Sequence, residues 1–172
     1  MATSRPPKIE IFERQGFFED FPNLNPQNHR VTSPATPDIP DRKRPYLVYN
    51  CFAMVVGDDT RVWWPGCRAY WPNSPSEDTV EELRRVLRQF GYAECEDGSF
   101  EKGTRKVAIF ADDHGVPTHV AFQPEFTSSP RRRWKSKMGK NINMEHELLA
   151  VESKLYGNPV QYMSRSIRPR DN

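Results

Sequence analysis

The fold is decided by two apolar runs, Val107-Ala108-Ile109-Phe110-Ala111 and Thr118-His119-Val120-Ala121-Phe122. Both runs are rich in residues that favour β-strands. The residues between them include Asp112-Asp113-His114-Gly115, which is typical of a tight turn. The two runs are therefore predicted to form an antiparallel hairpin, with His119 on the returning strand.

Three segments after the hairpin extend the predicted sheet. Residues 131–138 form a third strand, which Gly139 closes. Residues 143–149 are predicted to form a short helix or turn, and residues 160–163 a final strand. The second half of the chain is thus predicted to be a largely antiparallel sheet.

Two helices are predicted before the hairpin. The first lies within residues 46–56 and ends at Gly57, although the valines of this segment also allow a strand. The second begins at Ser74-Pro75-Ser76-Glu77, a capping-box pattern, and ends at Gly91. Its apolar residues recur at helical spacing. This order of elements predicts an α+β fold.

The 172 residues suit one domain with an arm and a tail. We expect an N-terminal arm at 1–20, a single α+β domain at 21–163 and a basic tail at 164–172. The sixteen prolines cluster before residue 46, so residues 21–45 are predicted to be an extended, turn-rich wrap.

Composition excludes several classes of protein. The formal charge of +2 argues against nucleic acid as the main partner, so we expect the basic run at residues 131–140 to lie on a solvated strand edge. The chain shows neither a signal peptide nor a membrane-spanning segment, which predicts a cytoplasmic protein unless a non-classical route delivers it elsewhere. The three cysteines match no zinc spacing, so neither a metal nor a cofactor is expected.

A cysteine at a predicted helix start is the first candidate site residue. Cys51 follows Asn50, and the N-terminus of a helix favours the nucleophilic thiolate. His119 is the candidate base, and Ser136 on the adjacent strand is the candidate group to orient it. His146 is a rival base, or a residue that supports the catalytic residues without reacting itself. The backbone N–H of Cys51 with Asn50 would stabilise an oxyanion, and Gln27 and Asn28 are alternatives to Asn50.

Tryptophans supply candidates for a substrate surface. Trp63, Trp64 and Trp71 are predicted to pack an aromatic loop beside the site, and the alternative is that one of them forms a wall of the substrate site. Trp134 is predicted to be a core or cleft-floor residue. Lys137 would either lie exposed at a strand edge or face a substrate carboxylate.

Three motifs carry a family resemblance: Asn-Cys-Phe-Ala at 50–53, Pro-Thr-His-Val-Ala at 117–121 and Trp-Lys-Ser-Lys-Met-Gly at 134–139. Together they resemble the core of papain-like or NlpC/P60-like cysteine peptidases. Over most of residues 20–165 the chain is also similar to an uncharacterised microbial domain family. That family carries Phe-Pro-Asn, Tyr-Asn-Cys, Trp-Trp-Pro and Glu-His elements and has no assigned function.

The papain-like resemblance implies a cysteine helix, a second helix and an antiparallel sheet. It places Ser136 where an asparagine would orient the histidine, and no residue matches the glutamine of the oxyanion site. The expected function is a cysteine hydrolase that acts by acyl transfer on an amide, peptide or thioester through Cys51 and His119. The alternative is a non-catalytic protein-interaction module on the same scaffold, with the aromatic loop as its partner surface.

Overall fold

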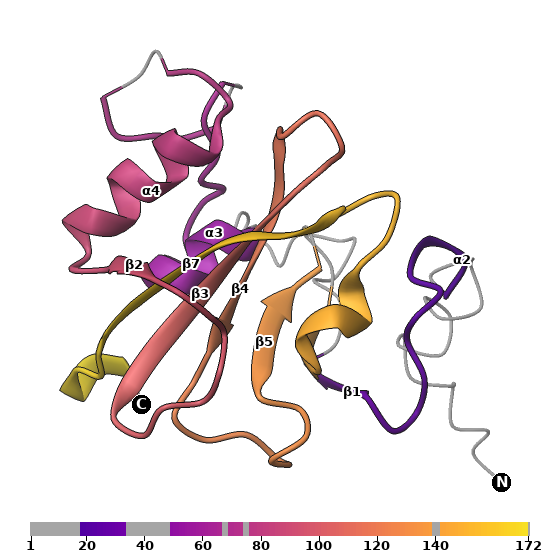
Figure 1. Cartoon of the computed structure of the whole chain (residues 1–172). Coiled ribbons are helices and arrows are strands. Elements are labelled where there is room, and N and C mark those ends of the chain that lie inside the picture. The colour runs from indigo at the N-terminus through magenta and orange to yellow at the C-terminus, as the bar shows by residue number, and fades with distance from the viewer. Residues whose placement is uncertain (1–17, 34–48, 67–68, 74–75, 139–141, 172) are drawn as a thin grey trace, which may run out of the picture.

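The computed structural model describes residues 18–33, 49–66, 69–73, 76–138 and 142–171. The elements are numbered as in Figure 1. In chain order they are α2 (Phe18–Asp20), β1 (His29–Ser33), α3 (Cys51–Val56), α4 (Val80–Gln89), β2 (Ala93–Cys95), β3 (Thr104–Ala111), β4 (Pro117–Gln123), β5 (Trp134–Lys137), β6 (Asn143–His146), the 3₁₀-helix η2 (Leu148–Val151), β7 (Asn158–Ser166) and the 3₁₀-helix η3 (Pro169–Asp171).

The strands form one seven-stranded sheet in the order β1-β6-β5-β4-β3-β7-β2. Each pair of neighbours is antiparallel. The predicted hairpin is β3 and β4, and it lies near the centre of the sheet (Figure 1). The α+β prediction is therefore confirmed.

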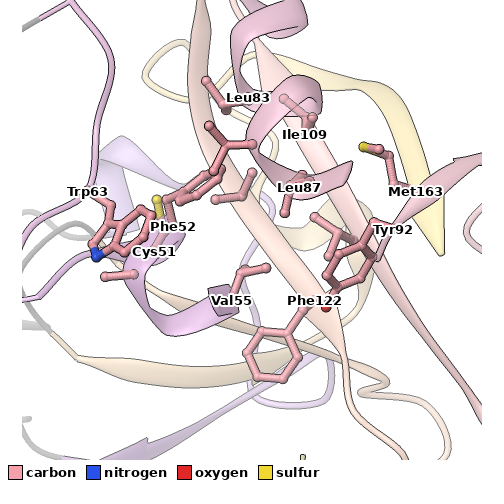
Figure 2. Close-up of a cluster of buried hydrophobic side chains, with 14 of the residues drawn as sticks. Cys51, Phe52, Val55, Trp63, Leu83, Leu87, Tyr92, Ile109, Phe122 and Met163 are labelled. Carbon is pink, nitrogen blue, oxygen red and sulfur yellow. The ribbon is translucent and has the colours of Figure 1, made fainter. Parts of the chain in front are cut away.

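One face of the sheet, which we call the helix face, packs against α3 and α4 (Figure 1). Ile109 and Val120 are register partners in the hairpin, and both belong to the buried cluster on this face. The helices contribute Phe52 and Leu87, which are fully buried (Figure 2). Side chains that alternate along β3 and β4 therefore anchor both helices.

The other face of the sheet, which we call the second face, has its own buried cluster. Its residues include Phe110 of β3, whose register partner in β4 is His119. Other members come from the segment after α2, from η2 and from the connection to β7: Phe21, Leu24, Ala150, Val151 and Tyr156. The sheet is thus covered on both faces, and this explains why β3 and β4 are buried along almost their whole length.

The two helices form, but α4 begins later than predicted. Gly57 ends α3 with φ 80°, a left-handed conformation that glycine adopts without strain. Thr79 caps α4 by accepting a hydrogen bond from Glu82 N, so Thr79-x-x-Glu82 replaces the predicted box at residues 74–77. Ser74 and Pro75 lie outside the described residues, and Glu77 precedes the helix.

The sheet is larger than predicted. Residues 29–33 form β1 within the expected wrap, and β2 was not predicted. Residues 143–146 form β6 instead of the start of a short helix or turn, because they pair with both β1 and β5. Only residues 148–151 after them are helical. Long-range pairing, which the local sequence does not report, accounts for these differences.

The predicted tail is joined to the domain. Strand β7 continues to Ser166, and η3 follows it. Asp171 accepts two hydrogen bonds from Arg165, at 2.6 and 2.7 Å, and lies 3.5 Å from Arg105. Residues 164–171 therefore belong to the fold. Residues 1–17 of the predicted arm lie outside the described residues, and no described helix has the length and apolar character needed to cross a membrane.

Candidate functional site

Cys51 is the first residue of α3, at the helix start where it was expected. Asn50 is the N-cap, and its Oδ1 accepts hydrogen bonds from Ala53 N at 3.2 Å and Trp63 N at 3.1 Å. Its Nδ2 donates to the Trp63 carbonyl at 2.9 Å. The Asn50 amide therefore joins α3 to the aromatic loop. These three hydrogen bonds hold backbone groups of α3 and of the loop, and none of them is directed at the thiol.

The Cys51 thiol is buried in the helix-face cluster, together with Trp63 and Phe52 (Figure 2). Cys51 as a whole is 5% exposed. Burial raises the pKa of the thiol to about 11, and this effect outweighs backbone hydrogen bonds from Val120, Phe52 and Cys51 that lower the pKa. The thiol is therefore protonated near neutral pH, the opposite of an activated nucleophile.

His119 lies on the other face of the sheet. Val120, the next residue of β4, belongs to the helix-face cluster, and successive side chains of a strand point to opposite faces. His119 accordingly packs against Phe110, with ring centroids 5.5 Å apart, and against Tyr156, with centroids 4.0 Å apart. The structure does not bring Cys51 and His119 together, so the expected nucleophile–base pair is absent.

The rival base does not approach the thiol either. His146 of β6 pairs with Trp134 of β5, and Trp134 belongs to the second-face cluster. His29 is the register partner of His146 and shares its face. His114 is exposed in the hairpin turn. Every histidine in the chain is described, and none of the four faces Cys51.

The structure does bring His119 and Ser136 together, and it adds His146 to them. Ser136 Oγ lies 2.8 Å from His119 Nε2 and 2.7 Å from His146 Nε2. His146 Nδ1 lies 2.6 Å from the backbone carbonyl of Glu147. All three side chains are buried, with His119 and His146 at 0% exposure and Ser136 at 1%. We call His119, Ser136 and His146 the histidine chain.

Burial also controls the ionisation of the histidine chain. Loss of hydration lowers the pKa of His119 well below its ordinary value, and the nearby His146 lowers it further. Burial lowers the pKa of His146 to about 4, although its bond to the Glu147 carbonyl opposes the shift and His29 adds to it. Both imidazoles are therefore neutral at pH 7.

The candidate substrate tryptophans do not share a surface. Trp63 is buried on the helix face, where its Nε1 donates to Asp58 at 2.7 Å, and Trp134 is buried on the second face. Trp64 is partly buried against the helix-face cluster. Trp71 is also core and donates to Glu82. Trp63 and Trp134 therefore cannot line one substrate site in this structure.

Lys137 is a buried cation on the helix face, which neither of its predicted roles anticipated. It alternates with Ser136 along β5 and is 3% exposed. Its Nζ lies 4.2 Å from the centre of the Tyr49 ring. Burial lowers the pKa of this amine. Lys137 thus lies on the same side of the sheet as α3, which packs against β4 and β5.

Sequence reasoning missed the separation of the two predicted partners, although a signal for it was present. In the hairpin register Ile109 pairs with Val120, and the neighbouring residues Phe110 and His119 pair with each other, so the two pairs point to opposite faces. A helix that packs on Ile109 and Val120 therefore leaves His119, the neighbour of Val120, on the far face.

Across the described ranges, no group of three His, Cys, Asp or Glu side chains is placed to hold a metal ion.

Comparison with known proteins gives a family and no function. No match was found among curated proteins, and none among solved structures. A family model described as "Domain of unknown function (DUF7689)" matches residues 30–164, a span that runs from β1 into β7 and includes Cys51 and the histidine chain. The chain therefore belongs to the DUF7689 family.

Proposed function

We propose that this domain is a non-catalytic protein-interaction module. The observation that carries the proposal is the placement of Cys51 across the sheet from His119 and His146. Acyl transfer by a cysteine requires a base within hydrogen-bond reach of the thiol. The sheet itself blocks that approach, because both faces of β4 are packed.

The state of the thiol supports the same proposal. With a pKa of about 11, roughly one Cys51 side chain in a thousand is ionised at pH 8. The pair of bonds that holds Asn50 to the Trp63 backbone also gives Asn50 a structural role. Cys51 behaves as a small apolar core residue, the ordinary role of a buried cysteine.

The outer side of the aromatic loop supplies the proposed contact surface. Tyr70 is 40% exposed, and the Arg61 guanidinium lies 3.8 Å from the centre of its ring. Trp63 supports Tyr70 from the core side, with ring centroids 4.7 Å apart. A rigid tyrosine with a stacked arginine is typical of energetically important positions in protein–protein interfaces. We therefore propose a protein partner for this loop.

The scaffold is proposed to be papain-like on the basis of its element order. A cysteine-bearing helix, α3, comes before a second helix, α4, and both pack on an antiparallel sheet. This order is shared with the resemblance drawn from the sequence. The proposal concerns the scaffold only, since the nucleophile–base geometry of such enzymes is not present between Cys51 and His119.

A cysteine hydrolase that acts on an amide, peptide or thioester is the second candidate. Two observations favour it: Cys51 is the first residue of α3, and Lys137 lies on the same face of the sheet with a lowered pKa. In such an enzyme Lys137, and not His119, would accept the thiol proton. The two candidates therefore predict different effects of replacing Lys137: only in the hydrolase would the change lower the reactivity of Cys51.

Alkylation of the native protein separates the two candidates. Iodoacetamide labelling at pH 6 to 9, with peptide mapping, is expected to modify Cys95, which is partly exposed, and to leave Cys51 unmodified until denaturant is added. Lys137→Met and His119→Gln are expected to leave this protection unchanged. Rapid labelling of native Cys51 at pH 7 would overturn the module, and slower labelling in Lys137→Met would identify Lys137 as the base.

A further inference from the structure

The histidine chain connects three strands through side chains alone. His119 belongs to β4, Ser136 to β5 and His146 to β6, and the Glu147 carbonyl at the end of the chain caps the start of η2. Backbone pairing between β4 and β5 is limited to the partners Phe122 and Lys135. The chain therefore adds a cross-strand connection where the ladder of the sheet is weakest.

When both imidazoles are neutral, the hydrogen bonds of the histidine chain allow only one placement of its hydrogens. The Glu147 carbonyl can only accept, so His146 Nδ1 carries a hydrogen and Nε2 is an acceptor. Ser136 must then donate its hydroxyl hydrogen to His146 Nε2. Ser136 Oγ accepts in turn from His119 Nε2–H, which leaves His119 Nδ1 without a hydrogen.

His119 Nδ1 has no hydrogen-bond partner among the described residues and is fully buried. The ring lies flat on Tyr156, with 4° between the two planes, and the Thr118 hydroxyl fixes Tyr156 by donating to its carbonyl. Nδ1 can be left unpaired as an acceptor at modest cost. A hydrogen on this atom would be an unsatisfied buried donor.

The second face offers little to compensate a charge on the chain. The ionisable groups on or beside it include His29 of β1, Tyr156 of the connection before β7 and Tyr162 of β7. Glu152, which follows η2, acts electrostatically on Tyr162. Farther along the same face, Lys106 of β3 is paired with Asp97 at 3.3 Å. Within the described part of the chain, no carboxylate is recorded in contact with either imidazole of the histidine chain.

We infer that the histidine chain is an acid-sensitive lock that holds β4, β5, β6 and η2 together. A proton added to His146 Nε2 would reverse the bond to Ser136, so that Ser136 Oγ accepts from His146. Either the Ser136 hydroxyl hydrogen is then left without an acceptor, or it goes to His119 Nε2 and the His119 hydrogen moves to Nδ1, where no acceptor is described. Acid therefore replaces a satisfied chain by a buried cation and an unsatisfied donor, and this inference goes beyond the proposed partner binding.

The direction of the pH dependence follows from the depressed pKa values. An unfolded histidine titrates near pH 6.5, whereas His146 in the fold titrates at about 4 and His119 also well below its ordinary pKa. The unfolded state therefore takes up protons first as the pH falls. The lock is intact above about pH 7 and weakens from there to about pH 4, with up to a tenfold fall in the folding constant per pH unit for each histidine.

Nitrogen NMR of the wild-type protein at pH 7.5 tests the arrangement without any mutation. The expected result is opposite tautomers, with the hydrogen on Nε2 of His119 and on Nδ1 of His146. The signals of both rings should remain those of neutral imidazoles down to pH 5.5 while the protein is folded. Identical tautomers, or either ring titrating near pH 6.5 within the folded state, would overturn the lock.

Denaturant unfolding between pH 7 and 5.5 tests its consequence. The wild-type folding constant is expected to fall toward a hundredfold per pH unit below 6.5, with a smaller slope in His119→Gln, which loses one titrating ring and keeps a donor for Ser136. His114→Gln, which changes an exposed hairpin histidine, is the matched control and should keep the wild-type slope. An unchanged slope in His119→Gln would overturn the inference.

Discussion

Cys51 and His119 lie on opposite faces of the β-sheet. Cys51 belongs to the cluster that contains Val120, and His119, one residue earlier in β4, packs against Phe110 and Tyr156 on the other side. A backbone hydrogen bond from Val120 reaches the Cys51 thiol, so the thiol lies against β4 while the His119 ring lies on the other side of that strand. This relationship removes His119 as a base for Cys51 in the structure, because an imidazole cannot pass through a packed strand to reach a thiol, and it supports the proposed interaction module.

Replacing Cys51 by serine should destabilise the protein by about 1–3 kcal/mol, because a hydroxyl would replace a thiol inside an apolar cluster. Cys95→Ser is the control, since Cys95 is partly exposed, and it should change stability by less than about 0.5 kcal/mol. Chemical denaturation measures both. Equal stability of the two variants would show that Cys51 is less deeply packed than the structure has it.

Asn50→Ala should cost about 2–4 kcal/mol, because it removes a helix cap and both bonds to the Trp63 backbone. Thr79→Ala removes only the cap of α4 and should cost about 1 kcal/mol. Asn50→Asp keeps the acceptor and loses the donor, so its stability should lie between those of wild type and Asn50→Ala. Equal losses in Asn50→Ala and Thr79→Ala would contradict the proposed connection between α3 and the aromatic loop.

Gly157→Ala should destabilise the protein by on the order of 3 kcal/mol or more, because its φ is 66° and an added Cβ would collide with the Ala111 carbonyl. Gly103→Ala has a similar φ, 78°, with open space around the position, and should cost about 1 kcal/mol. Thermal unfolding compares the two. A difference below about 0.5 kcal/mol would mean that the approach of residue 157 to β3 is not maintained in solution.

Asp171→Asn should weaken the attachment of the C-terminal segment. Hydrogen bonds from Arg165 lower the pKa of this carboxyl to about 2, against a burial effect that raises it. Because the folded pKa is below the unfolded one, the carboxylate stabilises the fold above about pH 4, and that contribution is lost as the pH falls from 4 to 2. Asp171→Asn should therefore cost about 1–2 kcal/mol at pH 7 and much less at pH 2.5.

The control for this change is Asp113→Asn in the exposed hairpin turn, which should leave stability unchanged at both pH values. Urea titrations at pH 7 and at pH 2.5 provide the comparison. If Asp171→Asn is as stable as Asp113→Asn at pH 7, residues 164–171 are not held to the domain by Asp171.

Local patterns predicted the elements that depend on local causes. Gly57 ends α3 because only its own conformation is needed, and the alternating runs around the hairpin turn give β3 and β4. The predicted start of α4 at residues 74–77 is wrong because more than one residue of this segment can cap a helix, and in the structure Thr79 accepts the capping hydrogen bond from Glu82 N. Strands β1 and β2 were missed because each is short and forms through a distant partner.

The sequence by itself determined an α+β domain, the cysteine at a helix start and the strands that carry His119 and Ser136. Tertiary structure alone decided that Cys51 faces a hydrophobic core while His119, Ser136 and His146 join on the other side of the sheet. The physical reason is the twofold alternation of a strand, since a one-residue difference assigns a side chain to the opposite face. Which face receives α3 depends on the packing of the whole domain.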